Sequence, residues 1–146
     1  MKSLFENEAY SEIKERLNEL TKESVGKWGK MDVAQMLHHC QQPLNVSLGK
    51  GNLKKQFFPL AFLFKKMLYN DKPWKHNLPT AKGFKITDNK EFETEKYELE
   101  KLIDKFHVKK NETQWETHPV FGKFTPQQWG KMQYKHLDHH LKQFGV

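Results

Sequence analysis

Two histidines near the end of the chain, His136 and His140, have the spacing of a metal-binding pair. Residues four apart on a helix lie on one face, so both imidazoles can converge on one ion. The spacing alone is a weak signal, because most such pairs are surface or hydrogen-bonded core histidines. The pair therefore predicts a metal site only if a third ligand comes from another helix.

A second cluster, His38 and His39, lies in the first third of the chain and can supply that ligand. Histidine is the commonest metal ligand, and it suits borderline divalent metals. Three protein ligands leave a position open for water or substrate. Periodicity does not choose between His38 and His39, and it does not exclude His139. The spacing thus predicts a divalent-metal site whose ligand set is still open.

Cys40 is the only cysteine, which excludes an internal disulfide and a cysteine-based zinc finger. Neighbouring helical residues point about 100° apart, so Cys40 and His39 are not expected to share one ion. A buried, small apolar role is therefore the preferred interpretation of Cys40. His118 is interpreted as a turn residue. Four aromatic residues are interpreted as core rather than as ligand contacts: Trp28, Phe121, Phe124 and Trp129.

The elements that must position these histidines are helices. Apolar residues recur at helical spacing in four segments, namely 5–21, about 32–48, about 53–69 and 88–106. The fourth of these is expected to start at Thr87 or Asp88. Pro43 falls inside the second and predicts a kink or an early end there.

The last helix has the clearest start signal in the sequence. Thr125 suits the N-cap, Pro126 the first helical position, and Gln128 closes a capping box, with the helix running to about Phe144. No alternating strand pattern is present. Four or five helices with one long crossover predict one all-α domain over residues 1–146, a four-helix bundle.

The predicted third and fourth helices are separated by a long loop. The irregular stretch Asn70–Lys85 contains Pro73, Pro79 and Gly83. Loops of this length are uncommon in compact domains and are often functional.

The chain is basic, with a formal net charge of +7. Arg16 is the only arginine, and specific base readout relies heavily on arginine, so a sequence-specific DNA-binding protein is not expected. The lysine-rich segment 50–85 suits an anionic membrane, an acidic partner or a homodimer interface, but a solvated lysine face is preferred. No apolar run approaches the roughly 20 residues that span a bilayer, so a cytoplasmic location without a membrane span is expected.

Three segments resemble a known family: WGKMDVAQMLHHC (28–40), KPWKHNLPT (72–80) and HPVFGKFTPQQWGKMQYKHLDHHLKQFG (118–145). They resemble a DinB-like family of unknown function, a branch of the DinB/YfiT-like superfamily, and the likeness extends over nearly the whole chain. The resemblance implies a four-helix bundle whose metal is held by one histidine of the second helix and an HxxxH pair of the last. Position by position, these ligands are His39, His136 and His140, whereas His38 and His139 fall outside the frame.

The resemblance also implies a chemistry. Members of the superfamily include thiol-dependent transferases, and a bound metal lowers the pKa of a thiol or of water. We therefore expect a metal-dependent enzyme of the transferase or hydrolase type. Its cofactor would be zinc, nickel, cobalt or iron, and its substrate a small molecule, including a low-molecular-weight thiol. The alternatives are a non-catalytic binding module with a vestigial metal site, and a lysine-rich binder of nucleic acid or membrane.

Overall fold

The computed structural model describes residues 1–51, 64–78 and 82–146, and this part of the chain is helical. It contains four α-helices and two short 3-10 helices, in the order α1 (Asn7–Glu19), α2 (Val33–Ser47), η1 (Lys66–Leu68), η2 (Lys82–Phe84), α4 (Phe92–Val108) and α5 (Pro126–Gln143). The described residues form no β-strand, only an isolated bridge between His118 and Gly122. The prediction of an all-α chain is confirmed for them.

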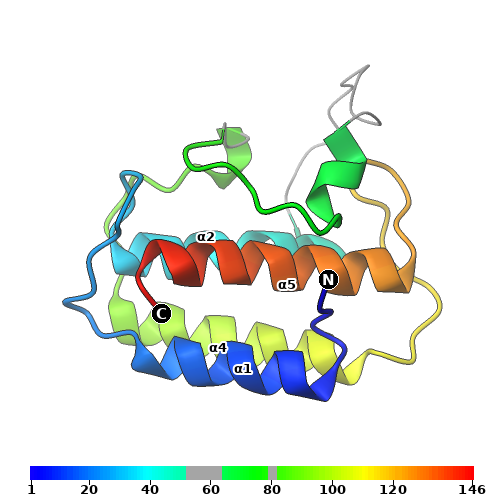
Figure 1. The fold of residues 1–146 in the computed structure, drawn as a ribbon, viewed down its shortest axis with the longest axis horizontal. Helices are drawn as coiled ribbons and strands as arrows, with labels where there is room; N and C mark the ends of the chain where they lie inside the picture. Colours follow the sequence, from blue (N-terminus) through cyan, green and yellow to red (C-terminus); the bar gives the residue numbers. More distant parts are fainter. Residues whose placement is uncertain (52–63, 79–81) are drawn as a thin grey trace.

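The four α-helices lie side by side in two layers, with α2 and α5 in one and α1 and α4 in the other (Figure 1). α2 packs against α4 and α5, and α1 packs against α5 and α4. The segment that carries η1 and η2 lies over the layer of α2 and α5, on the side away from α1 and α4 (Figure 1). The two predicted histidine clusters are thus on neighbouring helices beneath this segment.

The predicted start of α5 is confirmed in detail. The Thr125 hydroxyl accepts the backbone N–H of Gln128 at 3.2 Å, and the Gln128 side chain accepts the backbone N–H of Thr125 at 3.0 Å. This reciprocal capping box satisfies two backbone donors that have no partner inside the helix. Pro126 holds the first helical position, where no backbone donor is needed.

The predicted cap of α4 was wrong. The helix begins at Phe92, and its N-cap is Glu91 rather than Thr87 or Asp88. The Glu91 carboxylate accepts the backbone N–H groups of Glu93 at 3.1 Å and Thr94 at 2.7 Å. A glutamate reaches the same backbone donors as the shorter capping residues, and its charge suits the positive end of the helix.

Pro43 does not end α2, which continues to Ser47. Proline lacks the N–H that would bond to the carbonyl of His39, one turn earlier. The carbonyl of Pro43 itself accepts the side-chain amide of Gln133 at 2.8 Å. This bond joins α2 to α5 one turn away from His39 and His136, so it helps to align the two helices that carry the histidines.

The predicted third helix, 53–69, lies largely outside the described residues. Its described end contains η1. The predicted irregular stretch Asn70–Lys85 consists of turns, bends and η2 wherever the structure describes it.

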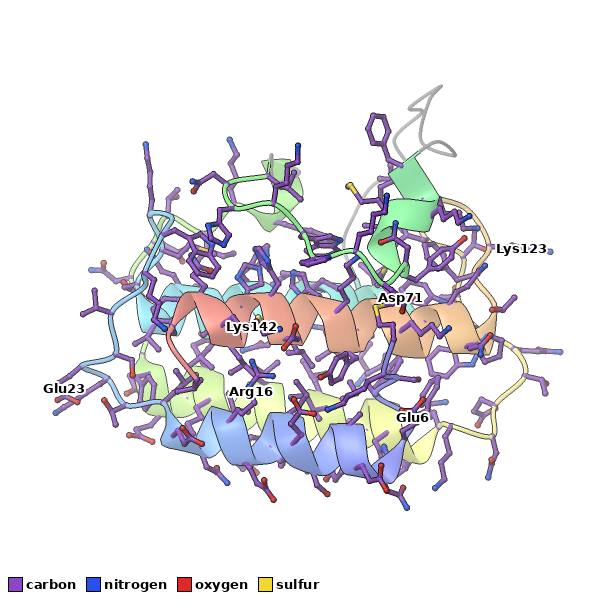
Figure 2. All side chains as sticks on the ribbon, viewed as in Figure 1. Glu6, Arg16, Glu23, Asp71, Lys123 and Lys142 are labelled. Atoms are coloured by element: carbon purple, nitrogen blue, oxygen red, sulfur yellow. The ribbon has the colours of Figure 1, made fainter. Side chains whose placement is uncertain are left out.

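The core lies between the two helical layers. Its largest fully buried side chains include Leu4, Ile13, Leu17, Met36, Leu37, Leu44, Leu99, Ile103, Phe106, Trp129 and Leu137. Arg16 points from α1 towards α5 (Figure 2), where its guanidinium lies 2.9 Å from the carboxylate of Asp138 and donates to the carbonyl of Val146 at 3.0 Å. Apolar burial and this charged contact together hold α1 against α5.

Gly130 lets the N-terminal segment cross α5 at close range. The backbone N–H of Leu4 donates to the Gly130 carbonyl at 3.0 Å. A Cβ atom at position 130 would lie 2.7 Å from the Phe5 ring and closer still to the Ser3 hydroxyl. Only glycine therefore fits here without displacing the crossing segment.

We predict that Gly130→Ala lowers the free energy of unfolding by about 1–3 kcal/mol, because overpacking outweighs the better helix propensity of alanine. Urea denaturation followed by circular dichroism measures the change. Gly122→Ala is the comparison, since a Cβ there meets nothing within 4 Å and adds only the strain of a positive φ of 74°. Unchanged or increased stability in Gly130→Ala would contradict this account of the crossing.

Candidate functional site

Three histidines meet in one buried cluster between α2 and α5. His39 comes from α2, and His136 and His140 come from consecutive turns of α5. One ring nitrogen from each lies within 4.8 Å of the others, which is close enough for the three to hold a metal ion. We call these residues the histidine triad. They are the residues that the sequence prediction placed at the metal site.

Hydrogen bonds assign the protons of two triad members. The Nδ1 atom of His39 is 2.9 Å from the carbonyl of Phe84, which can only accept, so Nδ1 carries the proton. Gln143 donates its amide to the carbonyl of Trp28 at 2.6 Å, so its oxygen accepts from His140 Nδ1 at 2.8 Å. In both neutral rings, Nε2 is left with a free lone pair. An outer hydrogen bond of this kind is the usual way in which a protein orients a metal-binding histidine.

His136 completes the cluster. Its Nε2 atom lies 3.1 Å from the Nε2 atom of His39, which carries no proton. The Nδ1 atom of His136 is buried and has no hydrogen-bond partner among the described residues. If His136 is neutral, its Nδ1 atom has either an N–H without an acceptor or a lone pair without a donor. The donor set fits a divalent cation, since a cation satisfies converging lone pairs without adding a proton.

Burial keeps the triad neutral. It lowers the pKa of His140 to about 3, with a further contribution from the nearby His39. Burial also holds the pKa of His136 well below its usual value, and the closeness of the His140 and His39 imidazoles acts in the same direction. The pKa of His39 is lowered mainly by burial, against the opposing effect of its bond to Phe84. Neutral imidazole is the form that binds metal, so no proton has to leave at neutral pH.

Within the described part of the chain, the cluster contains no carboxylate. Glu95 of α4, which contacts α2, and Asp138 of α5 are engaged elsewhere. Glu95 pairs with His38 at 2.8 Å, and Asp138 pairs with Arg16 and with Lys142. A divalent ion among three neutral imidazoles would keep its full charge, so the site suits an anionic ligand.

The histidines that periodicity did not exclude lie outside the triad. His38 points towards α4, where its Nδ1 atom meets Glu95. His139 is half-buried and lies beside His140, with ring centroids 5.1 Å apart. Cys40 is buried, as the preferred interpretation predicted, and burial raises the pKa of its thiol. Its sulfur contacts Met36 within α2 rather than the triad.

Aromatic residues border the triad, and the sequence interpretation missed them. Trp74 lies against His136 and His139, with ring centroids 5.7 and 5.6 Å away. Trp28, which was interpreted as core, is instead half-buried and lies 5.8 Å from the His139 ring. Its other neighbour is His76, stacked at 3.8 Å. The segment KPWKHNLPT (72–80), which contributes to the family resemblance, includes two of these rings, but no periodic pattern placed them here.

Lys135 ties the segment of η1 to the helix that carries the pair. Its ammonium donates to the carbonyls of Met67 at 2.7 Å and Asn70 at 2.9 Å, and to the Asn70 side chain at 2.8 Å. The same ammonium lies 5.6 Å from the centre of the Trp74 ring. Burial lowers the pKa of Lys135 to about 8. Trp74 is thereby held next to His136, the residue that follows Lys135.

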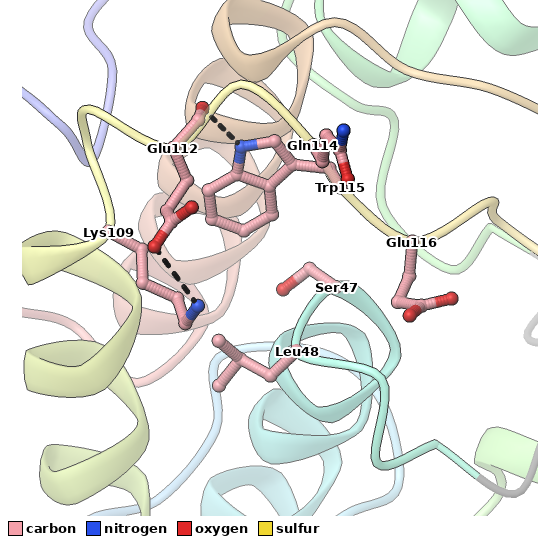
Figure 3. Close-up of a pocket in the computed structure, with 7 residues that line it drawn as sticks. All are labelled: Ser47, Leu48, Lys109, Glu112, Gln114, Trp115 and Glu116. Atoms are coloured by element: carbon pink, nitrogen blue, oxygen red, sulfur yellow. Dashed lines mark hydrogen bonds and ion pairs between the residues drawn. The ribbon is translucent and has the colours of Figure 1, made fainter.

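A cavity lies away from the triad, at the C-terminal ends of α2 and α4 (Figure 3). This cavity of about 320 Å³ is lined by Ser47, Leu48, Lys109, Glu112, Gln114, Trp115 and Glu116. Lys109 and Glu112 pair at 3.7 Å, and the Trp115 indole donates to the Glu112 carbonyl at 3.0 Å. These polar groups satisfy one another, so the cavity offers less chemistry than the triad.

His118 is a buried turn residue, as the sequence interpretation held. Its Nδ1 atom accepts the backbone N–H groups of Val120 at 3.1 Å and Phe121 at 3.2 Å. Its ring packs against Trp129, whose ring centroid is 5.9 Å away. Trp129 precedes His136 by two turns, about 10 Å along the helix, so His118 supports the opposite end of α5.

These features define a helical protein with three buried histidines that lie close enough together to hold a metal ion. A family model described as "Protein of unknown function (DUF1569)" matches residues 3–145. The chain belongs to this family. No curated protein and no solved structure matches the chain.

None of the described helices combines the length and the apolar character needed to cross a membrane.

We predict that His118 makes the fold acid-sensitive. Burial, together with the charge of Lys65, lowers its pKa to about 4 in the folded protein. The unfolded chain therefore takes up a proton first as the pH falls below about 6.5, and stability is lost down to about pH 4. His118→Asn keeps an oxygen acceptor at the position of Nδ1 but cannot titrate.

Urea denaturation at pH 7 and at pH 4 measures the difference between the two proteins. The parent should lose about 3 kcal/mol more than His118→Asn over this interval, since one pKa unit corresponds to about 1.4 kcal/mol. The other buried histidines are present in both proteins, so their contribution cancels. Equal losses would contradict the assignment of a neutral, hydrogen-bonded His118.

Proposed function

We propose that this protein binds one divalent metal ion through His39, His136 and His140 and uses it in an enzymatic reaction. The observation that carries the proposal is the set of ring nitrogens within 4.8 Å, two of them with lone pairs fixed by outer hydrogen bonds. Zinc, nickel, cobalt and iron all suit imidazole ligands, and affinity order alone does not choose among them in a cell.

A three-histidine set supports catalysis better than a structural role. Structural zinc sites are closed by four protein ligands, whereas catalytic sites keep a position for water or substrate. A bound divalent ion lowers the pKa of a thiol or of water in that position. We therefore infer a transferase or hydrolase that acts on a small molecule, with a low-molecular-weight thiol or water as the nucleophile.

The protein's own contribution is to orient and shield this site. The carbonyl of Phe84 and the side chain of Gln143 fix the rings of His39 and His140. Burial excludes water from the back of the triad, which strengthens electrostatic attraction to an anionic nucleophile. The absence of a carboxylate from the described cluster favours the same ligand charge.

The fold proposal follows from the same helices. We infer that α1, α2, α4 and α5 form a four-helix bundle of the DinB/YfiT-like type. Support comes from the packing of α2 on α4 and α5, and of α1 on α4 and α5. Ligands from facing helices of a bundle are a recurrent way to build a metal site, and His39 faces the His136 and His140 pair in this manner.

We predict that the purified protein contains one divalent ion per chain when neither chelator nor nickel resin has been used. His39→Ala, His136→Ala and His140→Ala should each weaken metal binding by more than about 100-fold, beyond the usual effect of residues that only orient ligands. Elemental analysis and competition with a coloured chelator measure content and affinity.

His38→Ala is the matched control, because His38 precedes His39 but faces Glu95 on α4. It should retain the ion, and circular dichroism should show that all four variants keep their helical content. Loss of metal in His38→Ala alone, or retention in all three triad variants, would mean that the ligand set is wrong.

We predict that the metal-loaded protein accelerates the reaction of a small thiol with an alkyl halide. The thiol loses its proton to the buffer, its sulfur bonds to carbon, and halide leaves. His136→Ala should reduce the rate to that of the buffer, because the ion and its attraction for thiolate are both lost. A panel of thiols and electrophiles, together with ester substrates for the hydrolase, tests this by product analysis. Bound metal without turnover would favour a non-catalytic binding module.

A further inference from the structure

We infer that Trp74, His139 and Trp28 form an aromatic wall that selects a planar, conjugated anion as the ligand of the triad. The inference rests on the proposed metal site for the charge of the ligand, and on the wall for its shape. The wall is defined by the contacts of Trp74 with His136 and His139, and of Trp28 with His139. The three residues come from α5 and from two separate loops.

Burial changes stepwise from the triad to the solvent. The triad histidines are 5–8% exposed, the three wall residues are half-buried, and His76, which stacks on Trp28, is exposed. Half-buried indole rings at the border of a buried polar cluster are placed to contact a ligand that enters from the solvent side. Indoles that served only the core would be covered, as Trp129 is.

Trp28 and Trp74 are linked through hydrogen bonds to residues that hold or adjoin a triad member, and His139 directly precedes His140. The carbonyl of Trp28 holds Gln143, which in turn holds His140. The Trp74 indole donates to the carbonyl of Met67 at 2.9 Å, and that carbonyl also accepts from Lys135, next to His136. The wall is therefore preorganised relative to the triad, which lowers the entropy cost of binding a rigid ligand.

The aromatic wall could bind two kinds of ligand, a flat conjugated ring or a cation, and the charges around it favour one of them. Aromatic faces attract flat rings and also cations. A cationic ligand is disfavoured for two reasons. The Lys135 ammonium already lies 5.6 Å from the centre of the Trp74 ring, and a divalent ion in the triad would repel a second cation. The indole N–H of Trp74 is used by Met67, so this ring offers apolar contact rather than a hydrogen bond. A carboxylate or thiolate attached to a conjugated plane satisfies both the wall and the triad.

Benzoate and cyclohexanecarboxylate are a matched pair of probes, since both are anionic at neutral pH and differ mainly in planarity. We expect benzoate to bind the parent protein about 5- to 10-fold more tightly, which lies within the range that corresponds to aromatic pairing. Tryptophan fluorescence measures both dissociation constants, in metal-free and in metal-loaded protein. Metal content is determined on the same samples.

Trp74→Leu should reduce the preference for benzoate to below about 2-fold and leave the metal content unchanged. Trp115→Leu is the control, because Trp115 lines the cavity at the other end of α2 and should not alter the preference. Trp28→Leu should also weaken the preference for benzoate, so the inference can still be tested if one of the two variants folds poorly.

The outcomes separate this inference from the proposed function. Metal binding without a preference for benzoate overturns the wall and leaves the metal site standing. The parent protein could instead take up no metal, prefer benzoate, and lose that preference in Trp74→Leu. This result would support the wall and overturn the metal site. A preference that survives in Trp74→Leu, or that disappears in Trp115→Leu, overturns the wall in either case.

Discussion

Three neutral imidazoles share one small buried space, and much of the surrounding structure depends on that constraint. Burial holds their pKa values down, which removes charge repulsion but leaves lone pairs facing each other. The carbonyl of Phe84 and the side chain of Gln143 prevent two of these rings from turning away. The arrangement is costly for an isolated helix pair, because buried polar atoms without partners destabilise a fold. The metal-binding role that we propose would give this cost a physical reason.

The helices supply rigidity, and the loops supply the surroundings of the site. α2 and α5 are joined beside the triad by the bond from Gln133 to Pro43, and α5 is fixed at its start by a reciprocal cap. The loops contribute Trp28, the segment with Trp74, and Phe84. Each loop contacts a triad member directly or through one side chain, so the site is built from segments that are far apart in sequence. This division of labour is common where a rigid scaffold presents functional loops.

Charge is distributed so that the site stays free of competing anions. The protein is basic overall. Glu95, which contacts α2 from α4, pairs with His38, and Asp138 of α5 pairs with Arg16 and Lys142. Lys135, which directly precedes His136, donates its hydrogen bonds to backbone and amide acceptors. The anionic ligand that we propose would therefore meet no competing carboxylate in the described cluster, and aromatic rings border it.

The sequence by itself determined the helical class, the cap of α5 and the face shared by His136 and His140, because these depend on local spacing and short-range hydrogen bonds. The choice of His39 over His38 came from family resemblance, and the packing of α2 against α4 explains it by directing His38 to Glu95. The N-cap of α4 could not be chosen from the sequence, because several polar residues precede the helix and the loop conformation decides that Glu91 reaches its backbone N–H groups. Only the tertiary structure decided the roles of Gln143, Lys135, Trp74 and Trp28. Their partners are distant in sequence, and no periodic pattern records contacts that form when loops fold over helices.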